Sequence, residues 1–187
     1  MSATVWKLDP AHSQVEFSVK HMMFTKVRGR FADVDGTIHL DEENPSASKV
    51  EVDIDAASID SRVEDRDTHL RSEDFLDVES HPKLTFRSKL IEGSAVADPG
   101  AEFKVIGDLT IRGVTKEVTL DARFEGTGTD PWGVSRAGFS ASTKLDRRDF
   151  DLTWNQALET GGVLVGHDVN IELQVQAVQE QEASVEA

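Results

Sequence analysis

Hydrophobic and polar residues alternate with a period of two along most of this 187-residue chain. In the segment Val15 to Val19, three apolar side chains are separated by Glu16 and Ser18, and the same pattern returns in several later segments. Because successive side chains of a strand point to opposite faces, each such segment has one apolar and one polar face. The strands that this pattern predicts lie near residues 4–8, 13–21, 29–41, 48–57, 83–92, 102–112, 116–126, 134–146 and 167–178.

Two segments interrupt the alternation and predict short helices. Ser61 is followed three residues later by Glu64, which is a capping box, and we expect a helix from about Arg62 to Arg71. A second helical turn is expected over residues 154–159. Gly161 and Gly162 follow this turn and are expected to end it.

The predicted elements make one all-β domain, residues 1–178, followed by a flexible acidic tail at 179–187. About eight antiparallel strands joined by short turns predict a barrel or a sandwich. A closed barrel is favoured because it leaves no exposed sheet edge. Such a barrel is either filled by its own side chains or holds one small ligand, and composition does not decide between these outcomes.

Charge and composition narrow the classes of partner. The chain has 35 acidic and 20 basic residues, a formal charge of −15, which disfavours nucleic acid and docking on anionic lipid surfaces. It has no cysteine, so disulfides and thiolate metal sites are excluded. No segment approaches the roughly 20 apolar residues of a membrane helix, so we expect no stable membrane insertion. The N-terminus has no basic and apolar leader, which predicts a cytoplasmic protein.

Catalytic and metal-binding motifs do not stand out. The six histidines form no His-x-His or His-x-x-x-His pair, and there is no Gly-x-Ser-x-Gly elbow or phosphate-binding loop. We therefore predict no catalytic residue, no metal and no cofactor.

One polar cluster could serve a ligand. Arg62, Arg66, His69 and Arg71 fall within ten residues of one another, and His21 ends an early strand. Cations at a barrel mouth can receive a phosphate or another polar head group, or they can pair with the acids at neighbouring helical positions. Pairing is favoured for Arg62 and Arg71, and both interpretations stay open for Arg66 and His69. The candidate head-group residues are His21, Arg66 and His69.

A second polar step, Arg147-Arg148-Asp149-Phe150, allows the same two interpretations. It is either a structural ion pair at a strand end or a contact at the rim of a ligand site, and the structural interpretation is favoured.

The apolar positions are rich in aromatic residues without hydroxyl groups. Nine Phe and three Trp stand against no Tyr, which suits a hydrocarbon guest better than a sugar or nucleotide, although such residues are also ordinary core. The candidate channel lining is Phe17, Val19, Phe31, Ile38, Val52, Ile54, Phe86, Phe103, Val105, Leu120, Phe124 and Phe139.

Several short motifs occur in a characteristic order, of which Ser58–Phe75 is the most specific. Together they resemble the YceI-like domain, a polyisoprenoid-binding family with a lipocalin-like fold. The motifs are Trp6–Ser13, Val15–His21, Gly29–Phe31, Ser58–Asp60, Arg66–Phe75, His81–Phe86, Gly107–Lys116, Arg148–Phe150 and Gly166–Val169.

The resemblance implies an extended antiparallel β-barrel of about eight strands with a long internal channel, here with one or two short helices. It implies binding, transport or storage of an isoprenoid lipid such as a polyprenyl phosphate or an isoprenoid quinone, and it is compatible with a homodimer. The alternatives are an enzyme that acts on an isoprenoid-like molecule, with His21 or His69 as acid or base, and a stress-related β protein with a filled core.

Overall fold

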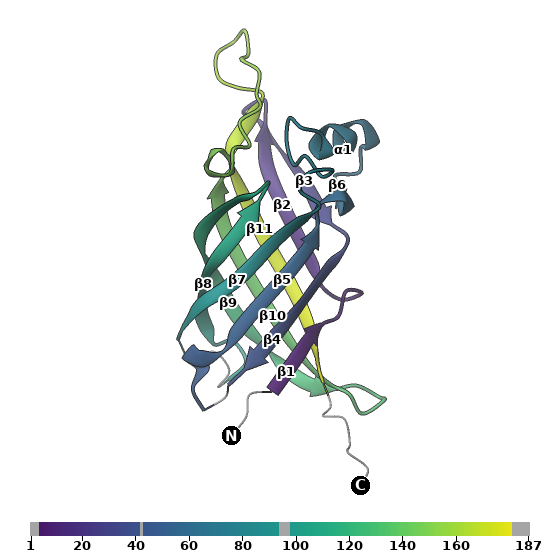
Figure 1. Cartoon of the computed structure of the whole chain (residues 1–187), viewed down its shortest axis with the longest axis vertical. Helices are drawn as coiled ribbons and strands as arrows, with labels where there is room; N and C mark the ends of the chain where they lie inside the picture. Colours follow the sequence, from purple (N-terminus) through teal and green to yellow (C-terminus); the bar gives the residue numbers. More distant parts are fainter. Residues whose placement is uncertain (1–3, 42, 94–97, 181–187) are drawn as a thin grey trace.

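The computed structural model describes residues 4–41, 43–93 and 98–180, which form one elongated barrel (Figure 1). Its single α-helix, α1, spans Glu64–Arg71, and three short 3-10 helices are η1 (Pro45–Ala47), η2 (Ala56–Ser58) and η3 (Arg147–Phe150). The strands are β1 (Thr4–Leu8), β2 (Gln14–His21), β3 (Thr25–Phe31), β4 (Val34–Leu40), β5 (Lys49–Asp55), β6 (Ile59–Asp60), β7 (Lys83–Gly93), β8 (Glu102–Ile111), β9 (Val114–Thr129), β10 (Ser135–Asp146) and β11 (Val165–Gln179).

The eleven strand segments form a closed antiparallel barrel of eight strands, as the sequence predicts. β1 and β2 both pair with the same edge of β11, so together they form one interrupted strand of the barrel. In the same way, β3 and β4 together form the next strand, and β5 and β6 form the one after it. The chain therefore runs up and down around the barrel, each strand beside the next. The expected single strand at 29–41 is instead β3 and β4, separated by Ala32 and Asp33, whose N–H groups both bond to Ser58.

The barrel closes where β1 meets β11. Trp6 is paired with Gln179 and Leu8 with Ala177, and the N–H of Glu180 donates to the carbonyl of Val5 at 2.8 Å. Between β1 and β2 the ladder continues through a side chain, because the buried Ser13 hydroxyl exchanges hydrogen bonds of 3.2 Å with the backbone of Gln176. This side chain bridges the break between β1 and β2 along the edge of β11.

The segment that contains α1 packs across one end of the barrel (Figure 1). The capping-box prediction is wrong: the helix begins at Glu64 without a side-chain cap, and the Ser61 hydroxyl donates to the buried carboxylate of Asp67 at 2.5 Å. Arg71 donates to the carbonyls of Ala57 and Ile59, so it ties the helix to the barrel rather than pairing with a neighbouring acid.

The second expected helix does not form. Residues 155–164 are an irregular hairpin, in which Ala157 and Val163 make an isolated bridge. Gly161 and Gly162 have φ of +89° and +84°, so they make a turn instead of ending a helix. The hairpin turn predicted at Arg112 and Gly113 is present, with both residues in the left-handed region.

The predicted acidic tail is largely outside the described part of the chain. Gln179 belongs to β11, and residues 181–187 lie outside the described residues. Within the described ranges, no helix is both long and apolar enough to span a bilayer.

An ion-pair network links β10 to the loop between β1 and β2 at one end of the barrel. Arg136 of β10 donates to Asp9 at 2.8 Å and to Asp130 at 2.9 Å. The hydrogen bond from His12, and after it that from Arg136, holds the pKa of Asp9 below its usual 3.8. The backbone N–H of Val134, followed by Arg136, lowers the pKa of Asp130 in the same way.

These lowered pKa values make a pH-dependent prediction for Arg136→Met. The stability that the two carboxylates contribute is present above pH 3.8 and is lost as the pH falls through their folded-state pKa values. We expect Arg136→Met to lower the urea midpoint at neutral pH, and we expect the difference from wild type to shrink well below pH 3.8. Arg123→Met, at an exposed arginine 3.7 Å from Glu125, is the control and should change the midpoint less. A midpoint difference that does not vary with pH would contradict this account.

Candidate ligand-binding cavity

An apolar cavity of about 150 Å³ lies inside the half of the barrel nearer the chain termini. Its walls are inward-facing side chains from all eight strands of the barrel. Many of these, including Phe103, Leu120 and Phe139, are only partly buried although they face inward, because the barrel is not packed solid around them. The lumen is therefore hollow and hydrocarbon-like.

A second cavity, of about 430 Å³, continues the first toward the end that carries α1. Both cavities are lined by the same five residues, which mark the narrowing between them: Phe17, Phe31, Leu84, Ile111 and Ile171. We call these five residues the waist.

The aromatic rings of the waist are positioned by a glycine. Phe17 and Phe31 lie with ring centroids 5.7 Å apart, and Phe17 is paired across the ladder with Gly29. A Cβ atom at Gly29 would stand 2.3 Å from Cζ of Phe17, so glycine is required for the ring to lie against the wall.

Most of the residues predicted to line a channel face these cavities. Val19 lines the larger compartment, and Phe124 lines neither, because it is buried in the core against the ring of Phe139 at 5.5 Å. Those in the smaller compartment are Phe17, Phe31, Ile38, Val52, Ile54, Phe86, Phe103, Val105, Leu120 and Phe139.

Other lining residues were not singled out from the sequence. Ile171, Leu173 and Val175 come from β11, whose alternation was recognised and could have identified them. Leu152, Trp154 and the side chains around α1 come from irregular segments, where no periodicity marks the inward face.

The larger compartment is polar at its outer end, and the three candidate head-group residues His21, Arg66 and His69 all line it. Arg66 donates to the hydroxyl and the carbonyl oxygen of Ser61, each at 2.7 Å, and it makes no ion pair with a described residue. The Ser61 hydroxyl in turn donates to Asp67, so the buried carboxylate of Asp67 lies one hydrogen bond beyond the Arg66 guanidinium.

The two histidines differ in how far they are committed to protein partners. His69 makes a 2.9 Å contact from Nε2 to Asp74 and packs edge-on against Phe75 and Trp154, with ring centroids 5.0 and 4.6 Å away. His21 makes no side-chain hydrogen bond within the described residues and ends β2 at the cavity rim.

The Arg147-Arg148 step divides its roles between the two arginines. Arg148 pairs with Asp146 at 2.6 Å and lowers the pKa of that carboxyl to about 2, which is the ion pair favoured from the sequence. Arg147 is buried and lines the cavity. Its guanidinium donates to the carbonyls of Leu152, Trp154, Val165 and Gly166, and burial lowers its pKa.

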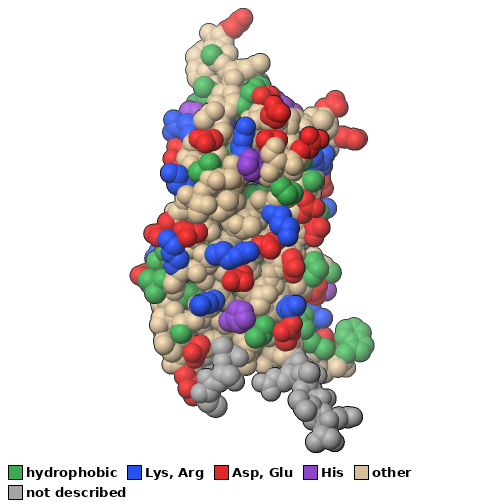
Figure 2. Space-filling model, viewed as in Figure 1, with side chains coloured by type: hydrophobic (Ala, Val, Ile, Leu, Met, Phe, Trp, Pro, Cys, Tyr) green, Lys and Arg blue, Asp and Glu red, His purple; other side chains and the backbone are tan. Residues whose placement is uncertain are grey.

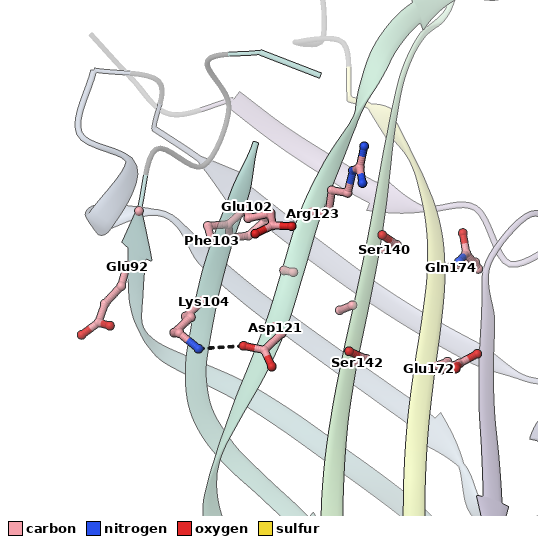
Figure 3. Close-up of a pocket in the computed structure, with 13 residues that line it drawn as sticks. Glu92, Glu102, Phe103, Lys104, Asp121, Arg123, Ser140, Ser142, Glu172 and Gln174 are labelled. Atoms are coloured by element: carbon pink, nitrogen blue, oxygen red, sulfur yellow. Dashed lines mark hydrogen bonds and ion pairs between the residues drawn. The ribbon is translucent and has the colours of Figure 1, made fainter. Parts of the chain in front are cut away.

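A further hollow, of about 770 Å³, lies outside the barrel, and its lining is charged and polar. Figure 3 shows its charged and polar side chains, with Lys104 bonded to Asp121 at 2.7 Å. Acidic and basic side chains are likewise interspersed over the outer wall in Figure 2. This surface offers no enclosed apolar space.

Known proteins resemble this chain in sequence and in fold. The sequence matches the YceI-like domain over residues 6–177. It is 44% identical over 153 residues to Protein YceI of Salmonella newport, which covers 81% of this chain and 78% of that protein.

Two solved structures share the fold. Burkholderia cenocepacia BcnA superposes with a TM-score of 0.76 at 23% identity, covering 90% of this chain and 98% of the other. A polyisoprenoid-binding domain from Saccharophagus degradans, implicated in plant cell wall breakdown, gives a TM-score of 0.71 at 13% identity, covering 95% and 99%. At these identities the likeness concerns the fold alone.

The buried guanidinium of Arg147 predicts a large loss of stability on substitution. Arg147→Met leaves the carbonyls that it caps, among them those of Leu152 and Val165, without their donor. We expect the free energy of unfolding, measured by urea titration, to fall by about 2 kcal/mol or more. The neighbouring variant Arg148→Met, at an exposed side chain, is the control and should lose less. Equal losses would show that the carbonyl contacts of Arg147 contribute little.

Proposed function

This chain belongs to the YceI-like domain family, and from the apolar tunnel inside its barrel we propose that it binds a long isoprenoid lipid for transport or storage. The ligand is a polyprenyl phosphate or an isoprenoid quinone. The observation that carries the proposal is the pair of neighbouring apolar compartments inside the barrel, which share the wall residues of the waist. The polyisoprenoid-binding description of the Saccharophagus domain, which has the same fold, supports it.

The tunnel can supply the affinity through its walls alone. Each methylene group that leaves water contributes about 0.8 kcal/mol, so a single five-carbon isoprene unit contributes a few kcal/mol before the costs of binding. The smaller compartment is lined almost entirely by apolar groups, because the hydroxyls of its Ser48, Ser140 and Thr143 are hydrogen-bonded to Asp41, Glu125 and Thr119. It therefore suits the tail and offers no partner for a charge.

The polar end of the larger compartment suits the head group. The side chains of His21, Arg66, His69 and Arg147 line it, and Asp65 is the one carboxylate among its lining residues. A phosphate or a quinone oxygen placed there would meet hydrogen-bond donors. The ligand would thus lie with its head near α1 and its tail toward the chain termini.

The hollow lumen weighs against the alternative of a β protein with a filled core. Packed interiors have few voids larger than a water molecule, whereas here the two compartments measure about 150 and 430 Å³. Together they fall in the range of cavities that hold small organic ligands.

A plug at the waist tests whether the tunnel holds the tail. Ile171→Trp places a bulky indole ring where both compartments have the smaller isoleucine side chain, so we expect it to weaken binding of a long polyprenol by about tenfold or more while a short prenol is less affected. Binding is measured by titration with fluorescent polyprenols of two lengths. Mass spectrometry of a solvent extract should also find an isoprenoid in the purified wild-type protein.

Asn170→Trp is the matched control, because residue 170 is the exposed neighbour on the outer face of β11. This variant should bind both prenols as the wild type does. Absence of any extracted isoprenoid, together with failure of the wild type to bind either prenol, would refute the proposal.

The head-group assignment has its own test. Arg66→Ala and His69→Ala should weaken binding of a polyprenyl phosphate by about tenfold, and that of the neutral polyprenol much less, because the lost groups interact with charge. Arg62→Ala, at an exposed residue that lines neither compartment, is the control. Equal losses for the two ligands would remove Arg66 and His69 from the head-group role.

A further inference from the structure

The tip of the β2–β3 hairpin exposes three consecutive large apolar side chains. Met22, Met23 and Phe24 are 40%, 53% and 83% exposed, and the turn is closed by the N–H of Phe24 bonding to the carbonyl of His21 at 3.1 Å. Single exposed apolar residues are ordinary on protein surfaces, whereas a contiguous exposed group is a candidate interaction site.

The backbone of this tip is costly for the residues that it contains. Met22 and Met23 have φ of +51° and +68°, a turn geometry that asparagine and glycine adopt with little strain and methionine does not. Turn chemistry therefore does not account for these residues. An asparagine-glycine turn would fit this backbone but would not present these apolar side chains.

The strands that carry the tip are locally basic in an acidic protein. Residues 17–32 contain Lys20, Lys26, Arg28 and Arg30 and no acid, whereas the whole chain has a formal charge of −15. Of these four cations, only Arg30 has an acidic partner within the described part of the chain, Asp60 at 3.4 Å.

Two of these cations face each other directly. Lys20 and Lys26 are cross-strand partners, both exposed on the outer face of the hairpin. Like charges placed opposite each other destabilise a sheet, and an anion between them relieves the repulsion. The hairpin thus joins an apolar tip to a cationic flank, which is the pattern of elements that lie in the interface of a bilayer.

The tip stands beside the opening of the tunnel. His21 and Leu164 line the larger compartment, and the N–H of Met22 donates to the carbonyl of Leu164 at 2.8 Å. The neighbouring hairpin, residues 155–164, carries one acid, Glu159. Figure 1 shows both hairpins at the end of the barrel opposite the chain termini.

We infer that the β2–β3 hairpin docks the barrel on a bilayer that contains anionic phospholipid. Met23 and Phe24 enter between the lipids, and Lys20, Lys26 and Arg28 meet their phosphates. The acidic remainder of the protein is repelled by the same surface, so the molecule stands with its tunnel opening against the membrane and docks reversibly. The docked membrane would be the place from which the bound isoprenoid is taken and to which it is delivered, and in this respect the inference rests on the proposed function. The docking itself does not depend on that function.

Vesicle sedimentation tests the docking directly. The wild type is mixed with vesicles of phosphatidylcholine alone, or of phosphatidylcholine and phosphatidylglycerol in equal amounts. We expect tighter binding to the anionic vesicles, weakened by added salt. Phe24→Ser should reduce that binding by about tenfold, and Lys26→Glu by about fivefold or more with little effect on pure phosphatidylcholine.

The chain offers matched controls at the opposite end of the barrel. Trp132 is also 83% exposed, in the turn between β9 and β10, and Lys49 is exposed at the start of β5. Trp132→Ser and Lys49→Glu make the same chemical changes as the hairpin variants and should leave vesicle binding within about twofold of wild type. Circular dichroism checks that each variant is folded.

Several outcomes would overturn the inference. These are absence of wild-type binding to either vesicle, equal losses for the control and hairpin variants, and displacement from vesicles by soluble glycerophosphoglycerol. Loss of a dimer in Phe24→Ser with vesicle binding unchanged would assign the tip to a second copy of the chain. Prenol titration without vesicles separates the two proposals, because Phe24 and Lys26 line neither compartment and their variants should bind prenol normally.

Discussion

The pairing of β1 with β11 is the interaction on which the rest of the structure depends. Every strand has one apolar face, and that face is removed from water only when the sheet closes on itself. Three residues of β1, Trp6 to Leu8, pair with β11, and Trp6 and Leu8 are buried near the fully buried Ala177. The Ser13 hydroxyl completes the ladder where the backbone turns away. Closure with eight strands also sets the diameter, which leaves room for a guest or for side chains but not for a wide channel.

Whether such a lumen is hollow is decided by where its large side chains lie. Phe17 rests over Gly29, and Phe86 rests over Gly107, where a Cβ would stand 2.7 Å from its ring. In each case the absence of a side chain on one strand lets the ring of its neighbour lie flat along the wall instead of crossing the lumen. Glycine in a strand usually weakens it, but here it marks a close approach that keeps the tunnel open.

The alternation of residues predicted the strands well, because burial of one face acts on every second residue independently of distant contacts. Most of the apolar positions that it singles out line the two cavities, and their role in binding stays a prediction. It could not separate Phe124, which packs into the wall, from Phe139, which faces the cavity, since both occupy apolar positions of adjacent strands. The local signals at Ser61 and at Gly161 failed because tertiary partners override them: Ser61 bonds to Asp67, and the glycines form a hairpin. Arg147 contacts carbonyl groups of residues up to 19 positions away in the sequence, and no sequence motif indicates these contacts.

The arrangement of the two ends bears on how a lipid would exchange with a membrane. A charged head group pays a large desolvation cost in an apolar tunnel, so a path that sends it through the waist is blocked energetically. With Arg66 and Arg147 at the open end and hydrocarbon walls below, the head can remain near the opening while the tail swings inward. An apolar tip beside that opening shortens the distance over which the tail is exposed to water, because bilayer and tunnel then lie side by side. In the proposed function, the polar end of the cavity and the apolar tip of the hairpin would together let a hydrocarbon chain move between two apolar phases without burial of its charge.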